Sequence, residues 1–275
     1  MDRLRSREEA TAGEAPTAGR TPAAWRNAAR RLRRAGEALA FGALDLLYPP
    51  HCLACGDPLP PSPGPRLCAR CRAEVKWVGA ACAACGTPRP PFAGKADRCD
   101  SCRGRALHFR RARGAVLYEG PVRKLLHRLK FENLALAAEP LAGFAVEALR
   151  RDPWGFAAGA QAVVPVPVHW TRRRRRGFNQ SELLARRIAR ALRLPCVAAL
   201  KKTRATEAQV DLPRERRLEN PRGAFRARRI ARIRGRTVLL VDDVMTTAST
   251  AAECSRVLLE AGAREVLAFA VARQA

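Results

Sequence analysis

The stretch Thr237-Val-Leu-Leu-Val-Asp-Asp-Val-Met-Thr-Thr-Ala-Ser-Thr250 carries the strongest indication of the fold. Its apolar first half predicts a buried strand that ends at two acids, and the Ala-rich segment after its hydroxyl-rich turn predicts a helix. Similar apolar runs alternate with helical patterns elsewhere, which indicates an α/β fold with a mostly parallel sheet flanked by helices. The predicted strands span residues 114–118, 162–168, 194–199, 237–241 and 266–271, and the predicted helices span 121–128, 134–149, 179–192 and 249–261.

The turn after the two acids has the composition of a phosphate-binding site. Amides at a helix N-terminus and neighbouring hydroxyls can surround a phosphate monoester, and Asp242 and Asp243 can accept hydrogen bonds from vicinal sugar hydroxyls. A phosphate close to a diol describes ribose 5-phosphate. An Asp-rich strand end before capping hydroxyls is also common in α/β folds that bind no such ligand, so the pattern alone leaves both interpretations open. The hydroxyls belong to Thr246, Thr247, Ser249 and Thr250.

Eight of the ten cysteines lie between residues 52 and 102 as four CxxC pairs. Two such pairs separated by a short loop can hold one structural Zn²⁺ with four thiolates, and so we expect two closed sites that cannot activate water. We expect the first pair to join the second and the third to join the fourth, although a cross-braced pairing fits the spacing too. A redox CxxC motif, an iron–sulfur cluster and incidental cysteines are the alternatives. The candidate ligands are Cys52, Cys55, Cys68, Cys71, Cys82, Cys85, Cys99 and Cys102.

The chain is strongly basic, with 52 Lys and Arg against 25 Asp and Glu and a formal charge of +27. Residues 172–236 carry 22 of the basic and five of the acidic side chains, a density that suits a single-stranded nucleic acid backbone. Only six of the 52 cations are Lys, so part of this charge reflects a general preference for Arg. Charge alone therefore does not identify a nucleic-acid-binding protein.

Several ordered stretches resemble the ComF family, also called competence protein F. They include Leu46-Leu-Tyr-Pro-Pro-His-Cys52, Tyr118-Glu-Gly-Pro-Val-Arg123 and, most distinctively, Arg175-Arg-Gly-Phe-Asn-Gln-Ser-Glu-Leu183. The segment that follows the two acids is similar to the loop with which type I phosphoribosyltransferases bind phosphoribosyl pyrophosphate (PRPP). The resemblance implies a type I phosphoribosyltransferase fold with an N-terminal double zinc ribbon.

The resemblance also implies roles for individual residues in binding PRPP together with Mg²⁺. Asp242 and Asp243 would engage the ribose hydroxyls, and the turn that includes Ala248 would hold the 5-phosphate. Arg176 and Gly177 would lie in a pyrophosphate loop, and Arg204, Gln209 and Arg217 would lie in a flexible hood over the ligand. The Mg²⁺ would bind chiefly through the ligand.

Two departures from the family pattern affect these expectations. The family loop usually has Gly where this chain has Ala248, and a positive φ at that position would cost Ala on the order of 1 kcal/mol. The chain also opens Met1-Asp2, without the N-terminal Cys nucleophile of the amidophosphoribosyltransferases, so we expect no ammonia release from glutamine.

We expect four parts along the chain. Residues 1–24 form a disordered tail, residues 25–47 an amphipathic helix, residues 48–106 the double zinc ribbon, and residues 107–275 the phosphoribosyltransferase-like domain. Neither a secretory signal nor a transmembrane segment is recognisable, and closely spaced cysteines suit a reducing compartment, so we expect a cytoplasmic protein. Cys196 and Cys254 lie among apolar residues and are expected in the core.

Two classes of function follow from the sequence. The first is a phosphoribosyltransferase with an unidentified acceptor, for which no general base can be named; His127 and His169 are the histidines nearest to the expected site. The second is a non-catalytic protein of the competence machinery. It would bind single-stranded DNA, or serve as a zinc-ribbon scaffold for a helicase or for membrane channel proteins involved in DNA uptake.

Overall fold

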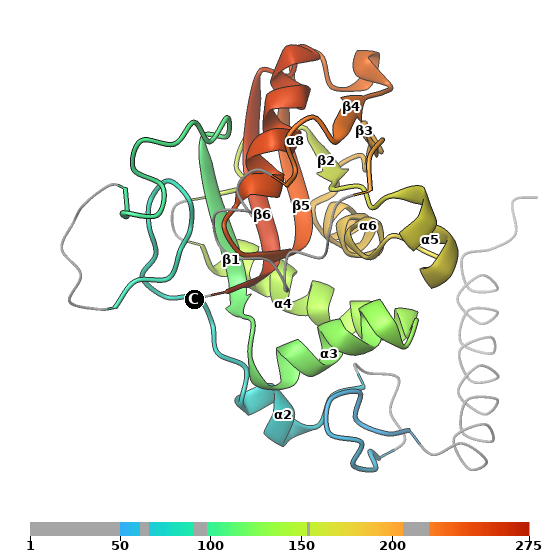
Figure 1. Ribbon diagram of the computed structural model, residues 1–275. Helices are drawn as coiled ribbons and strands as arrows, with labels where there is room; N and C mark the ends of the chain where they lie inside the picture. Colours follow the sequence, from blue (N-terminus) through green and yellow to red (C-terminus); the bar gives the residue numbers. More distant parts are fainter. Residues whose placement is uncertain (1–49, 61–65, 91–97, 153–154, 206–219, 275) are drawn as a thin grey trace, which may run out of the picture. The chain divides into compact units, whose positions relative to one another are not determined.

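The computed structural model describes residues 50–60, 66–90, 98–152, 155–205 and 220–274 (Figure 1). The expected tail of residues 1–24 and the expected helix of residues 25–47 lie outside these ranges. Within the described part, no helix combines the length and the apolar character needed to cross a bilayer. Residues 50–275 cluster as one compact unit, which contains both the cysteine-rich segment and the sheet.

A four-stranded parallel sheet forms the centre of this unit. Its strands lie in the order β1 (Arg111–Leu117), β6 (Glu265–Arg273), β5 (Thr237–Met245) and β2 (Ala162–Pro165). Every pairing is parallel, so all four carboxyl ends meet at one edge of the sheet. The predicted parallel α/β sheet is thus confirmed, and β5 brings the two acids to that edge from an interior position.

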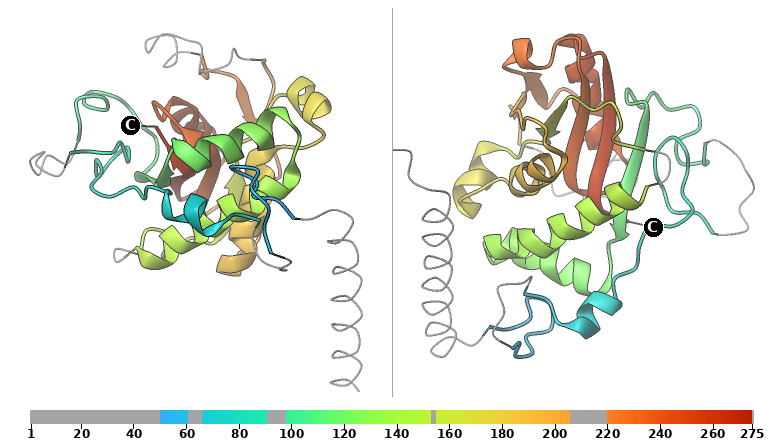
Figure 2. Two further views of the ribbon diagram at one scale, coloured as in Figure 1. Left: turned by 90° about the horizontal axis from the view of Figure 1, so that it is seen from below. Right: turned by 180° about the vertical axis from the view of Figure 1, so that it is seen from behind.

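Both faces of the sheet are buried, which explains why β5 reads as a continuous apolar run. Leu239 and Val241 belong to one hydrophobic core, whereas Val238 and Leu240 belong to a second core on the other face. Helices cover both faces, as the two views of Figure 2 illustrate. The first core includes α3 (Gly120–Phe131), α4 (Ala138–Arg151) and α6 (Gln180–Leu192), and the second includes α8 (Ser249–Glu260).

The cysteine-rich segment divides between the same two cores. The segment from Cys52 to Cys71, called the first ribbon below, contains the short helix α2 (Ala69–Ala73) and contributes Cys52 and Cys71 to the core of α3 and α4. The segment from Cys82 to Cys102, called the second ribbon below, contributes Cys82 and Cys102 to the core of α8. Each ribbon therefore buries its few apolar side chains against a different face of the sheet.

The segment between β2 and β5 departs from the prediction. The strand expected over residues 194–199 is wrong, because only Cys196 forms a bridge there, with Val163. Pro195 lacks the N–H that would continue the ladder. Instead β3 (Leu200–Lys202) pairs in antiparallel fashion with β4 (Phe225–Ala227).

Three short helices of the described residues were not predicted, namely α2, α5 (Trp170–Arg176) and η3 (Ile230–Arg232). The 3-10 helix η1 (Ala135–Ala137) lies within the helix predicted over residues 134–149. In α5, the His169 side chain accepts a hydrogen bond from the N–H of Thr171 at the first turn, and Gly177 ends the helix at a φ of 74°. Neither the charge pattern nor the hydrophobic spacing of the sequence predicts that His169 caps α5.

The contact between Gly114 and Arg273 gives the first prediction. A Cβ added at Gly114 would lie 2.5 Å from the Cβ of Arg273 on the neighbouring strand, and this first side-chain carbon cannot move aside. We expect Gly114→Ala to lower the free energy of unfolding by about 2 kcal/mol, measured by urea denaturation. The control is Gly143→Ala in α4, where an added Cβ meets nothing within 4 Å and we expect a gain of about 0.5–1 kcal/mol. Equal stability of the two variants would contradict this packing.

Candidate functional site

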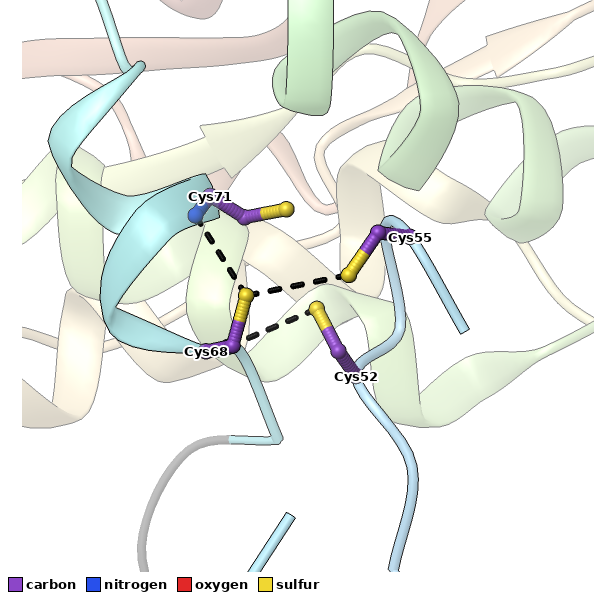
Figure 3. A group of neighbouring side chains, drawn as sticks. All are labelled: Cys52, Cys55, Cys68 and Cys71. Carbon is purple, nitrogen blue, oxygen red and sulfur yellow. Dashed lines mark hydrogen bonds between the residues drawn. The ribbon is translucent and has the colours of Figure 1, made fainter. Parts of the chain in front are cut away.

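Two cysteine tetrads are formed, with the pairing that was expected. Cys52, Cys55, Cys68 and Cys71 form the first, and Cys82, Cys85, Cys99 and Cys102 form the second, with the sulfurs of each within 4.8 Å of one another. Figure 3 shows the first tetrad with its sulfurs directed toward a common centre. Sulfurs placed at about 2.3 Å around Zn²⁺ would form a tetrahedron with edges of about 3.8 Å. Four Sγ–Sγ distances, one in the first tetrad and three in the second, are 3.5–3.8 Å and match this edge, so the two tetrads fit two structural zinc ions.

Backbone amides stabilise the thiolate form of one cysteine in each tetrad, Cys52 and Cys82, and the thiolate is the form that binds zinc. The N–H of Cys68 donates to the Sγ of Cys52 at 3.4 Å, and the N–H of Cys99 donates to the Sγ of Cys82 at 3.3 Å. Burial raises the pKa of the Cys52 thiol, but hydrogen bonds from backbone amides, that of Cys68 foremost, outweigh it and bring the pKa to about 6. The pKa of Cys82 falls to about 6 for the same reasons, with the amide of Cys85 foremost.

The two acids lie at the carboxyl edge of the sheet and are anchored there. The Ser181 hydroxyl, at the start of α6, donates to Asp242 Oδ1 at 2.9 Å, and the N–H of Asp243 donates to the same oxygen at 2.9 Å. Burial, followed by the charge of Asp243, raises the pKa of Asp242 to about 7. Near neutral pH this carboxyl therefore both accepts and releases a proton.

Two cations face Asp243 from different helices. The Nζ of Lys130, at the end of α3, lies 3.0 Å from Asp243 Oδ2. Burial lowers the pKa of the Arg176 guanidinium, while the nearby Asp243 opposes that change. The Nε of Arg176 is buried without a hydrogen-bond partner among the described residues, and its guanidinium lies 5.5 Å from the centre of the Phe131 ring. This side chain is suited to receive an anion.

The turn from β5 to α8 has a distinctive backbone. Ala248 caps α8 with a φ of 60°. This is the left-handed conformation whose cost for alanine the sequence analysis considered. The hydroxyls of Thr247 and Ser249 lie 2.8 Å apart. Arg273 donates to the carbonyls of Met245 and Thr246, and Arg105 donates to that of Thr247. In a trans peptide the next N–H points opposite to its carbonyl, so the amides of residues 246–248 point away from these two guanidinium groups.

The remaining candidate residues lie in two segments between β2 and β5. Gly177 ends helix α5, in the segment that joins β2 to α6. The exposed Arg204 guanidinium donates to the carbonyls of Asn220 and Arg222, which joins the two sides of the expected hood. Gln209 and Arg217 lie outside the described residues.

Three residues near the site were missed by the sequence analysis. They are Lys130, Gln180 and Lys202, of which only Gln180 lies in the most distinctive of the stretches that resemble the family. Burial, followed by the charge of Arg172, lowers the pKa of Lys202 to about 8, and Asp242 acts on it in the opposite direction. Gln180 is 0% exposed, and within the described structure neither its Oε1 nor its Nε2 has a partner. No local signal distinguishes these residues, because the fold brings them to β5 from far along the chain.

The fold and the site define a class of protein: a phosphoribosyltransferase-type domain preceded by two cysteine tetrads. A model of the double zinc ribbon domain matches residues 43–103, and a model of the phosphoribosyl transferase domain matches residues 179–275. Among solved structures, the Bacillus subtilis glutamine PRPP amidotransferase aligns at a TM-score of 0.35 with 21% identity, over 49% of this chain and 26% of that one.

Two named relatives narrow the class to a family. The DNA utilization protein YhgH of Escherichia coli K12 is 35% identical over 158 residues, which cover 57% of this chain and 69% of the relative. Competence protein F of Haemophilus influenzae is 33% identical over 159 residues, with the same coverage. The chain belongs to the ComF family.

The raised pKa of Asp242 predicts a dependence of stability on pH. Its pKa of about 7 in the folded chain exceeds the ordinary value of 3.8, so the resulting stabilisation is complete below about pH 4 and is lost as pH rises to about 7. Asp242→Asn keeps the acceptor oxygen but cannot ionise. We expect this variant to be more stable than the parent chain by about 2 kcal/mol at pH 8 and equally stable at pH 4, measured by urea denaturation.

The control for this prediction is Asp100→Asn, because the Asp100 side chain is 94% exposed. This control should follow the parent chain at both pH values. A stability difference between Asp242→Asn and the parent chain that is the same at pH 4 and pH 8 would contradict the prediction.

Proposed function

We propose that this chain binds the ribose 5-phosphate group of PRPP, with the hydroxyl-rich turn around the phosphate and Asp242 and Asp243 at the ribose hydroxyls. The observation that carries the proposal is the junction of two adjacent carboxylates with that turn at the carboxyl edge of a parallel sheet. Ligands of open α/β folds bind outside that edge. Helix N-termini there also favour the negative charge of a phosphate.

The cations around the site support a pyrophosphate as part of the ligand. Lys130, Arg176 and Lys202 come from three elements, and all three interact with one of the two acids. Asp242 accepts hydrogen bonds from Ser181 and Asp243, and Asp243 is paired with Lys130. Because both acids already have partners in the protein, a Mg²⁺ at this site would be held chiefly by the phosphates of the ligand. Such an ion would neutralise charge on a departing pyrophosphate. The carboxylates would stabilise positive charge that develops on the ribose.

Calorimetry tests the proposal with PRPP and Mg²⁺, and separately with ribose 5-phosphate. We expect both ligands to bind, and Asp242→Asn combined with Asp243→Asn to weaken the affinity at least tenfold, because both acceptors of the diol lose their charge. The control is Glu260→Gln near the end of α8, which leaves the site untouched. Absence of binding, or equal affinities of the double variant and the control, would refute the proposal. If PRPP binds, release of pyrophosphate in the presence of candidate acceptors would show that the chain also turns PRPP over.

We also propose a role in handling single-stranded DNA in the cytoplasm, which the names of the two relatives favour. Helix α5 exposes 61% of Trp170, and the guanidinium of Arg174 lies 5.7 Å from the centre of its ring. Phe131 is 58% exposed. Exposed aromatic rings stack on bases while arginines neutralise phosphates, which is the usual means of binding a single strand. A zinc-ribbon scaffold for a competence helicase or for channel proteins would instead bind its partners through the two ribbons.

Binding of a labelled oligonucleotide tests the DNA role. We expect Trp170→Ala to weaken binding about tenfold with an unchanged salt dependence, because it removes stacking and no charge. Replacing Arg172, Arg173, Arg174 and Arg175 by Ala should instead flatten the salt dependence. Binding that is absent or insensitive to salt would exclude the role.

A further inference from the structure

One guanidinium joins the second ribbon to the turn between β5 and α8. Arg273, the last residue of β6, is 1% exposed. Its Nη2 donates to the Thr87 hydroxyl at 2.6 Å and its Nε to the Gly86 carbonyl at 3.2 Å, both in the second ribbon. Its Nη1 donates to the Met245 carbonyl at 2.7 Å and to the next carbonyl along the turn.

Thr87 in turn contacts a cysteine of the second tetrad. The Thr87 hydroxyl, which accepts from Arg273, lies 3.1 Å from the Sγ of Cys85. Because a hydroxyl has one hydrogen to donate, Thr87 can donate it to the thiolate while it accepts from the guanidinium. Such outer contacts to a metal ligand influence how tightly the metal is held.

A second arginine makes a parallel connection. Arg105 donates to the Ser101 carbonyl at 3.1 Å and to the Thr247 carbonyl at 3.0 Å. Ser101 directly precedes the tetrad residue Cys102. Three consecutive carbonyls of the turn are thus held by side chains that also hold the second ribbon.

The first ribbon provides an internal comparison. Its sequence Cys52-Leu-Ala-Cys55-Gly-Asp57 corresponds to Cys82-Ala-Ala-Cys85-Gly-Thr87 in the second. Asp57, at the position of Thr87, forms an ion pair with Arg70 at 2.8 Å, and both side chains are at least half exposed. Asp57 and Arg70 both belong to the first ribbon, so this ion pair connects that ribbon to itself rather than to the turn.

We propose that the second tetrad and the ribose-phosphate turn are coupled through Thr87, Arg105 and Arg273, so that a ligand on the turn tightens one zinc site and not the other. This rests on the function proposed above. A turn held by the ligand keeps its three carbonyls in place for the two arginines, and these hold the ribbon around its metal. Because coupling is reciprocal, loss of the second zinc weakens ligand binding by the same factor. Thr87, Arg105 and Arg273 are positioning residues.

Release of zinc to a colorimetric chelator tests the coupling on the full chain. Saturating ribose 5-phosphate should slow the release of one of two zinc ions about fivefold or more and leave the other unchanged. Thr87→Val and Arg105→Ala should abolish this selective protection. Asp57→Asn in the first ribbon should retain it, as should Arg113→Ala, because Arg113 donates to the carbonyls of Cys82 and Ala83 but not to the turn. Equal protection of both ions, or protection that survives Thr87→Val and Arg105→Ala, would overturn the proposal.

A second measurement separates this inference from the proposed function. If ribose 5-phosphate does not bind the parent chain, the proposed function fails, but amide hydrogen exchange without ligand still tests the coupling. Faster exchange of residues 245–250 in Arg105→Ala than in Arg113→Ala supports the connection between ribbon and turn. Equal exchange in the two variants refutes it.

Discussion

A buried guanidinium must find acceptors for its donors, and the requirement at Arg273 links three parts of this molecule. Its partners lie in the second ribbon, at the end of β5 and in the turn that follows. Burial lowers the pKa of Arg273, with the thiol of Cys85 acting against that change. Leaving such a group without partners would cost several kcal/mol, so the turn, the strand end and the ribbon are fixed together.

The same arrangement explains how a cysteine-rich segment with few bulky apolar side chains becomes part of the fold. Each tetrad stabilises its own ribbon, and the two ribbons complete the two hydrophobic cores on opposite faces of the sheet. A Cβ added at Gly86 would lie 2.6 Å from the carbonyl oxygen of Ala112 in β1, so the backbone of the second ribbon approaches the sheet as closely as glycine allows. Metal binding and packing of the sheet are consequently not independent.

The sequence predicted features that depend on local pattern, namely the apolar strand of β5, the helix after its turn and the sequential pairing of the cysteines. The sequence did not predict the contacts of the site that join residues far apart along the chain. Lys130 and Ser181 reach the acids only because α3 and α6 end and begin at the same edge of the sheet. No sequence signal distinguishes Arg273 from the many other arginines of the chain. The pairing of β5 with β6 places it beside Met245 and the turn that follows. Residues 194–199 are apolar and therefore suggested a strand, but Pro195 has no N–H to pair with a neighbouring strand, and only Cys196 forms a bridge there.

Ala248 shows how these contacts bear on the site itself. A left-handed alanine costs on the order of 1–2 kcal/mol, and the turn opposes that cost in two ways. The Cβ is buried in the core of α8, where one methyl group contributes about 0.8 kcal/mol. The bonds from Arg273 and Arg105 to the three preceding carbonyls then leave the backbone little choice of conformation. Alanine is therefore tolerated at this left-handed position because Arg273 and Arg105 fix the backbone geometry that glycine would adopt unaided.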